Sequence, residues 1–110
     1  MQTNVHRLVL CTCPDQETAL GLAERLVEER LAACANLIPG IRSVYRWEGR
    51  IQQDAEVMLT IKTSDQRVDR LVERIRELHP YQVPEIIAIP ITEGSADYLN
   101  WVTTCTREQD

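Results

Sequence analysis

The run AACANLIPGIRSVYRWEGRIQQDAEVMLTIKT, residues 32–63, decides the fold. Two arms rich in Val, Ile, Leu, Tyr and Trp flank Glu48-Gly49-Arg50, a composition typical of two strands joined by a turn. We therefore expect one long hairpin over residues 33–63. Each arm would have about 10 to 13 residues, roughly twice the usual strand length.

The length of this hairpin also predicts an oligomer. A chain of 110 residues has too small a core to cover both faces of such a ribbon along its whole length. Near the tip, Tyr45, Trp47 and Ile51 would need cover from a neighbouring subunit. Pro39-Gly40 predicts a bulge or bend in the incoming arm, because proline cannot donate to the ladder and glycine is flexible.

The rest of the chain predicts two more strands and three helices. Strands are expected over residues 5–12, as a central strand, and 85–91, with Pro90 at an edge or end. Helices are expected from about Gln16 to Arg30, from a cap at Ser64 or Asp65 up to Pro80, and from 96 to about 107. The order is strand, helix, strand, strand, helix, strand, helix.

This order is the βαββαβ plan of an α+β, ferredoxin-like split βαβ domain with an added C-terminal helix. It predicts one domain over residues 1–110, with a four-stranded antiparallel sheet and both main helices on one face. A neighbouring subunit or the last helix is expected to cover the other face. Many functions share this architecture, so function has to come from particular residues.

Composition excludes several classes of protein. Hydrophobic residues make up 44% and charged residues 26%, as in an ordinary soluble domain. The net charge of -5 argues against general binding to nucleic acid or to anionic membranes. The first fifteen residues lack the apolar core of a signal peptide or membrane span. Cysteines at positions 11, 13, 34 and 105 form no CxxC pair, which favours reduced thiols in the cytoplasm.

Two cysteines are candidate metal ligands. Cys11 and Cys13 lie two apart at the end of the first strand, so both thiols point to one face. Thiolates are soft ligands suited to copper or zinc, and a helix N-terminus beside them would favour the thiolate. The alternative is that both are small buried apolar residues of a central strand, a common role for free cysteine.

Histidine offers a third candidate ligand. His79 lies at the end of the second helix, where it could bind metal with partners from elsewhere or only interact with the last carbonyl groups. His6 is predicted to lie on the surface. No two-histidine helical motif, CxxC or spaced carboxylate loop is present, so a closed structural zinc or calcium site is not expected.

Charged and aromatic residues on or beside the strands suggest a ligand cleft. The candidates are Trp47, Glu56, Lys62, Tyr81 and Glu85. The alternative is a solvated strand face with cross-strand ion pairs. No nucleophile elbow, phosphate-binding glycine loop or dinucleotide fingerprint is present, and no nucleophile and base are paired at a recognisable spacing. The sequence therefore predicts a protein that is not an enzyme.

Several of these segments together resemble a known family. The segments are LCTCPD (10–15), ERLAACANLIPGI (29–41), YRWEGRI (45–51), IKT (61–63), HPYQVPEIIAIPI (79–91) and DYLNWV (97–102). In this order they are similar to the CutA family of divalent-cation tolerance proteins. The resemblance implies a ferredoxin-like subunit in a tight homotrimer with shared hairpin arms, organised much like the nitrogen-regulatory signalling proteins.

The resemblance also implies a cytoplasmic bacterial protein associated with tolerance to copper and other divalent metals. In enterobacterial members, copper is bound by a cysteine that matches Cys11 and by a histidine pair whose second member matches His79. Leu78 stands where the first histidine of that pair would be, and Cys13 is a candidate substitute. The alternative expectation is a trimeric regulatory module that binds a small ligand or partner protein in clefts between subunits.

Overall fold

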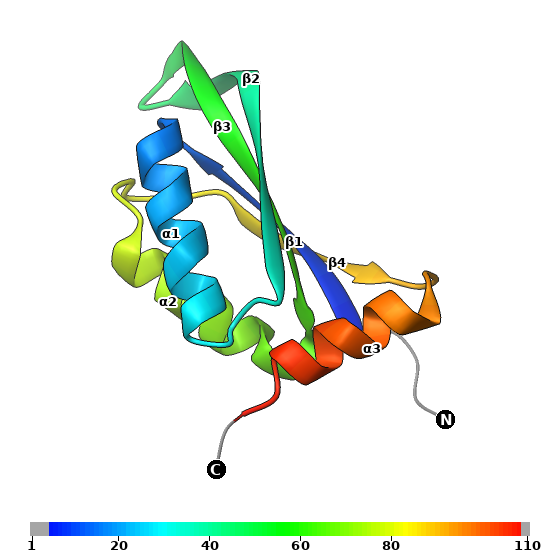
Figure 1. Cartoon of the computed structure of the whole chain (residues 1–110). Helices are drawn as coiled ribbons and strands as arrows, with labels where there is room; N and C mark the ends of the chain where they lie inside the picture. Colours follow the sequence, from blue (N-terminus) through cyan, green and yellow to red (C-terminus); the bar gives the residue numbers. More distant parts are fainter. Residues whose placement is uncertain (1–4, 109–110) are drawn as a thin grey trace.

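The computed structural model describes residues 5–108 and contains a four-stranded antiparallel sheet, three α-helices and one 3-10 turn (Figure 1). The elements follow the predicted order. They are β1 (His6–Cys13), α1 (Gln16–Glu28), β2 (Cys34–Trp47), β3 (Arg50–Ser64), the 3-10 turn η1 (Asp65–Arg67), α2 (Val68–Leu78), β4 (Ile86–Ile91) and α3 (Ala96–Cys105).

The sheet has the strand order β2-β3-β1-β4. Central strand β1 pairs antiparallel with β3 on one side and with β4 on the other. Strand β4, which contains Pro90, is an edge strand, as predicted. The split βαβ topology and the α+β architecture are therefore confirmed, and the two crossovers lead through α1 and α2.

The core lies between one face of the sheet and helices α1 and α2. Each helix buries an apolar stripe at helical spacing, which includes Leu22 and Leu26 in α1 and Leu71 and Ile75 in α2. These side chains join Val9, Leu59 and Ile61 of the central strands in one cluster. Burying each such side chain contributes about 1.5–3 kcal/mol.

Local capping residues fix where the helices begin. The Asp15 carboxylate accepts a hydrogen bond of 2.7 Å from the main-chain N–H of Thr18, so Asp15 is the N-cap of α1, as predicted. The cap expected at Ser64 or Asp65 is wrong for α2, because residues 65–67 form η1 and α2 begins at Val68. Helix α2 ends at Leu78, since Pro80 cannot continue it.

The predicted hairpin is present, with strands of 14 and 15 residues. Its turn is Glu48-Gly49, with φ of 51° and 79°, the positive values of a type I′ turn. A bulge interrupts the register between Ile38 and Ile41, and Gly40 there has φ of 82°. The arms exceed the predicted length because β3 first pairs with β2 alone and then continues along β1.

Helix α3 covers one end of the sheet on the face opposite α1 and α2. His6 Nε2 lies 2.8 Å from the hydroxyl of Thr103, and the Ser64 hydroxyl is hydrogen-bonded to that of Thr106. The prediction that His6 lies on the surface is therefore wrong, since only 8% of it is exposed. The cause is tertiary, because α3 packs over the start of β1.

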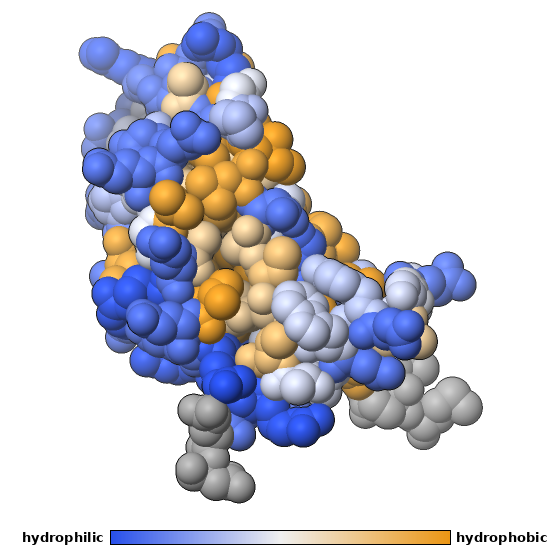
Figure 2. Space-filling view, viewed as in Figure 1, coloured by the Kyte–Doolittle hydropathy of each residue, from blue (hydrophilic) through white to orange (hydrophobic). Residues whose placement is uncertain are grey.

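The rest of that face carries apolar side chains that are exposed or half-buried. Register places Leu8 opposite Ile89, Leu10 opposite Ile87 and Met58 opposite Ile38, and side chains of paired residues share a face. Figure 2 shows apolar surface gathered in a band over the strands, beside the polar helices. Within residues 5–108, no helix is long and apolar enough to cross a membrane.

Candidate metal centre and adjoining groove

The two thiols of Cys11 and Cys13 lie at the end of β1, beneath α1 and α2. They are two residues apart in a strand, so both side chains point to the core face. Both residues are fully buried. The expectation that they share one face is confirmed, and so is their burial.

His79 completes a cluster with these thiols. It is the C-cap residue of α2 and is 7% exposed. One ligand atom from each of Cys11, Cys13 and His79 lies within 4.8 Å of the other two. His79, at least 66 positions from either cysteine in the sequence, thus joins them at one point, because α2 ends beside the last residues of β1.

Both ring nitrogens of His79 have hydrogen-bond partners. Nδ1 accepts a bond of 3.1 Å from the main-chain N–H of Tyr81, so the ring proton belongs on Nε2. Nε2 then donates to the carbonyl oxygen of Thr12 at 2.8 Å. The rings of His79 and Tyr81 also lie against each other, with centroids 4.8 Å apart. A metal ion at His79 would have to replace one of these two hydrogen bonds.

The thiols differ in their readiness to ionise. The hydrogen bond from the Cys11 thiol lowers the pKa of Cys13 because it stabilises the Cys13 thiolate. The same bond, followed by burial and by the negative charges of Cys13, Glu85 and Glu56, raises the pKa of Cys11. The two thiols are therefore coupled, and Cys13 ionises before Cys11.

This donor set fits a soft transition-metal ion. Two sulfurs and one imidazole are ligands preferred by copper and zinc, whereas calcium and magnesium require oxygen. A closed structural zinc site needs four protein ligands, and the cluster has three. Leu78 supplies no ligand, since its side chain packs against the core. Cys11, Cys13 and His79 would together hold the ion.

A groove of about 870 Å³ adjoins the cluster. Residues 43–47 of β2 form one wall and residues 80–85, between α2 and β4, form the other. Its buried members are Thr12 and Glu56, and Glu56 is 7% exposed. The Glu56 carboxylate accepts a hydrogen bond of 2.8 Å from the phenol of Tyr81.

Four of the five predicted cleft residues line this groove. They are Trp47, Glu56, Tyr81 and Glu85. Lys62 is not among the lining residues. Its ammonium group instead donates to the side chain of Asn36 and lies 3.4 Å from the carbonyl oxygen of Thr60. The predicted group of five residues is therefore only partly brought together.

Sequence reasoning missed two features of the site. The carbonyl oxygen of Thr12 binds His79, and no side-chain pattern could have indicated a main-chain acceptor. The phenol of Tyr45 donates to the carboxylate of Asp54, a bond that raises the pKa of Tyr45. The turn at Glu48-Gly49 could have indicated this pair, because it sets Tyr45 opposite Gln52 and diagonal to Asp54.

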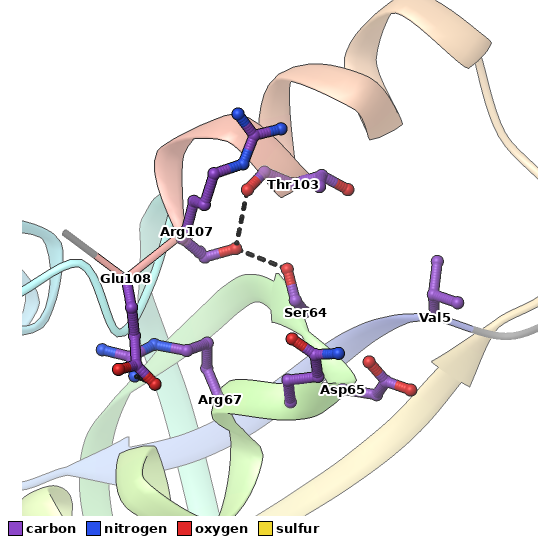
Figure 3. Close-up of a pocket in the computed structure, with 9 residues that line it drawn as sticks. Val5, Ser64, Asp65, Arg67, Thr103, Arg107 and Glu108 are labelled. Carbon is purple, nitrogen blue, oxygen red and sulfur yellow. Dashed lines mark hydrogen bonds and ion pairs between the residues drawn. The ribbon is translucent and has the colours of Figure 1, made fainter. Parts of the chain in front are cut away.

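A second cavity, of about 520 Å³, lies at the other end of the sheet, where α3 meets η1 (Figure 3). Its polar groups are largely paired with one another. The Arg67 guanidinium lies 3.4 Å from the Glu108 carboxylate and also donates to the carbonyl oxygen of Arg30 at 3.3 Å. Arg67 thus joins the segment after α3 to the body of the molecule. Among residues 5–108, this cavity presents no cluster of metal-ligating groups.

Comparison with known proteins identifies the family. Residues 7–105 match the family model described as CutA1 divalent ion tolerance protein. The chain belongs to the CutA1 family. The CutA of Thermus thermophilus, named a divalent-cation tolerance protein, is 49% identical over 98 residues, which are 89% of this chain and 95% of that protein.

Solved CutA1 structures share the whole fold. The Oryza sativa CutA1 structure superposes with a TM-score of 0.92 at 46% identity, covering 97% of this chain and 98% of the other. The Archaeoglobus fulgidus CutA, described as periplasmic, has a TM-score of 0.90 at 34% identity and covers 93% and 99% of the two chains. Both likenesses extend over nearly all of each chain, so the βαββαβ plan and the long hairpin belong to the family.

Proposed function

We propose that this CutA1 chain acts in tolerance to divalent cations by binding copper through Cys11, Cys13 and His79. The observation that carries the proposal is the approach of two thiols and one imidazole to within 4.8 Å of one another in the core. A relative at 49% identity is named for divalent-cation tolerance, which supports the role. Buried sulfur ligands would hold a soft ion away from solvent and from reactive partners.

Binding would change the protonation and hydrogen bonds of the cluster. Thiols ligate metal as thiolates, so both Cys11 and Cys13 would give up their protons to solvent on binding. His79 would free one ring nitrogen, at Thr12 or at Tyr81. The thiol of Cys13, whose pKa is lowered, is the first that would bind.

Native mass spectrometry of reduced protein titrated with copper tests this proposal. One copper per chain is expected, and uptake should be lost in Cys11→Ala, Cys13→Ala and His79→Ala. Cys34→Ser and Cys105→Ser are matched controls, because these free thiols lie outside the cluster. Copper uptake that survives Cys11→Ala, or that disappears in the two controls instead, would contradict the assignment.

A homotrimer in the cytoplasm is part of the same proposal. The exposed apolar face around Ile38, Ile87 and Ile89 supports assembly, since 46%, 49% and 41% of these residues is exposed. Four free cysteines support a reducing compartment. Because one relative is described as periplasmic, cell fractionation with an antibody is the direct test of location.

The alternative function is a nitrogen-regulator-like signalling module that binds a small ligand or a protein partner. The groove beside Trp47, Glu56 and Tyr81 favours it, because a concave site with aromatic walls and one buried carboxylate is typical of ligand sites. In a trimer the neighbouring subunit would extend this groove into an intersubunit cleft. Thermal-shift screening of common metabolites against wild type and Trp47→Ala would detect such a ligand.

A further inference from the structure

The cluster of Cys11, Cys13 and His79 is closed to solvent. Both cysteines are fully buried and belong to the apolar core beneath α1 and α2, and His79 is 7% exposed. On its other side the cluster meets the groove, because Thr12, which accepts the His79 hydrogen bond, also lines the groove. A metal ion or reagent that approaches from the groove therefore meets the segment that follows His79.

Tyr81 is the residue of that segment which separates the groove from the cluster. Its main-chain N–H binds Nδ1 of His79 at 3.1 Å, and its ring lies 4.8 Å from the imidazole. Its phenol donates to Glu56 at 2.8 Å across the groove. The segment between α2 and β4 has no helix or strand to hold it, so these contacts fix the position of Tyr81.

We propose that Tyr81 gates access from the groove to the Cys11–Cys13–His79 cluster, with its hydrogen bond to Glu56 holding the gate closed. A cation in the groove is attracted to the carboxylates of Glu56 and Glu85 and competes with the phenol for Glu56. When Tyr81 moves, its N–H also leaves Nδ1 of His79. One displacement therefore opens the path and frees a ligand nitrogen. For copper this mechanism rests on the proposed function.

The negative charges along this path favour movement of a metal ion from the groove to the cluster. Glu56 and Glu85 both line the groove, whose lining also includes Thr12 and Tyr81, the two hydrogen-bond partners of His79. Carboxylate oxygens hold a soft ion more weakly than thiolates do. An ion attracted by the groove carboxylates would pass on to sulfur rather than remain at oxygen.

The gate is tested first without metal, by the rate at which a thiol reagent labels the cluster. In a Cys34→Ser/Cys105→Ser background, only Cys11 and Cys13 remain to react with 5,5'-dithiobis(2-nitrobenzoate). Tyr81→Phe removes the phenol hydroxyl and keeps the ring. Labelling should become about tenfold faster, the effect of losing one charge-assisted hydrogen bond from the closed state. The free energy of unfolding should fall by the corresponding amount, about 1.4 kcal/mol, because the unfolded chain also lacks this bond. The urea dependence of the labelling rate, weak for local opening and equal to the full m-value for global unfolding, distinguishes the two.

Tyr45→Phe is the matched control. Tyr45 lines the same groove and its phenol also donates to a carboxylate, that of Asp54, but no contact joins it to His79 among the described interactions. Its labelling rate should equal that of wild type. Equal rates in Tyr81→Phe and wild type, or equal acceleration in both tyrosine variants, would overturn the gate.

Stopped-flow exchange of copper(I) with the chelator bicinchoninate then tests metal passage. Tyr81→Phe should raise the rates of uptake and release together, about tenfold each, and leave the dissociation constant within about twofold. Glu85→Gln should slow uptake at low salt only. An increase in the release rate alone would overturn the gate, since Tyr81 would then stabilise the bound ion. Faster labelling without any copper uptake by wild type would leave the gate for thiols standing and contradict the proposed function.

Discussion

Nδ1 of His79 accepts the main-chain N–H of Tyr81 at 3.1 Å, so the imidazole of His79 carries its proton on Nε2. That proton is donated to Thr12 at 2.8 Å. We expect nitrogen NMR of the metal-free protein to report the Nε2–H tautomer for His79. Copper bound at Nδ1 should shift the Nδ1 resonance and leave the proton on Nε2, whereas magnesium, which prefers oxygen ligands, should change neither nitrogen. An Nδ1–H tautomer in the metal-free protein would contradict the geometry of the cluster.

Removal of Leu59 should weaken the core strongly. Leu59 is fully buried in β3 between β1 and β2, so Leu59→Ala leaves a cavity. We expect the free energy of unfolding to fall by about 2–5 kcal/mol. Denaturant unfolding at one fixed protein concentration measures it. Leu20→Ala is the control, because Leu20 is 52% exposed on α1 and its removal should change stability by less than about 0.5 kcal/mol.

The hairpin turn contains a residue in an unfavourable conformation. Glu48 has φ of 51°, a left-handed value that asparagine adopts more readily than glutamate. Glu48→Asn should therefore raise the free energy of unfolding, by roughly 0.5 kcal/mol. Gly49→Val should lower it, because a β-branched residue at φ of 79° is strained. Equal stability of both variants would indicate that the turn has another conformation.

The ion pair between α1 and α2 predicts a pH dependence. Arg74 donates to both carboxylate oxygens of Glu29, each at 2.9 Å, and holds the pKa of Glu29 below its ordinary value. Because the pKa of Glu29 is lower in the folded chain than in the unfolded chain, the ionised carboxylate stabilises the fold at pH values above its unfolded pKa. This stabilisation is lost as the pH falls through the folded pKa. Glu29→Gln should lower the melting temperature at pH 7 and have no effect once wild-type Glu29 is protonated. A difference that persists in strong acid would exclude this cause.

Assembly through the exposed sheet face can be tested with one charge. Ile87 is 49% exposed on β4 and shares its face with Leu10. Ile87→Lys should convert the expected trimer into monomers in analytical ultracentrifugation, because a buried unpaired charge is costly. Leu20→Lys, on α1, should leave the trimer intact. A wild-type monomer at micromolar concentration would contradict the argument from the long hairpin.

The sequence predicted the order of elements well because local patterns determine it. The spacing of apolar residues indicates α1 and α2. Pro80 indicates the end of α2 and Pro90 the edge strand β4, and Glu48-Gly49 indicates the hairpin turn. The sequence did not predict the strand lengths and the burial that depend on tertiary contacts. The hairpin arms are longer than expected, since β3 also pairs with β1, and His6 is buried because α3 packs over it.

The site was harder to predict than the fold. Cys11, Cys13 and His79 were named by chemical type, and only the packing of α2 against β1 determines that they meet. The hydrogen bonds that occupy both His79 nitrogens have no sequence signal, because their partners are main-chain groups. The charge of Lys62 suggests a cleft residue, but the register turns it towards Asn36 rather than into the groove.

The bulge at Pro39-Gly40 has a consequence for how this chain can vary in length. Two residues of β2 there oppose one of β3, so the alternation of side chains changes phase between Leu37 and Tyr45. Ile38 and Ile41 pair with Met58 and Glu56, which are two residues apart in β3, so Ile38 and Ile41 share a face. Deleting Pro39 or Gly40 alone would therefore restore the regular ladder and leave Tyr45 opposite Gln52 on its present face. Deleting both would turn the residues from Ile41 to the turn onto the opposite face. Natural relatives that lack the bulge should therefore be one residue shorter at this point, which counting residues in aligned sequences can check.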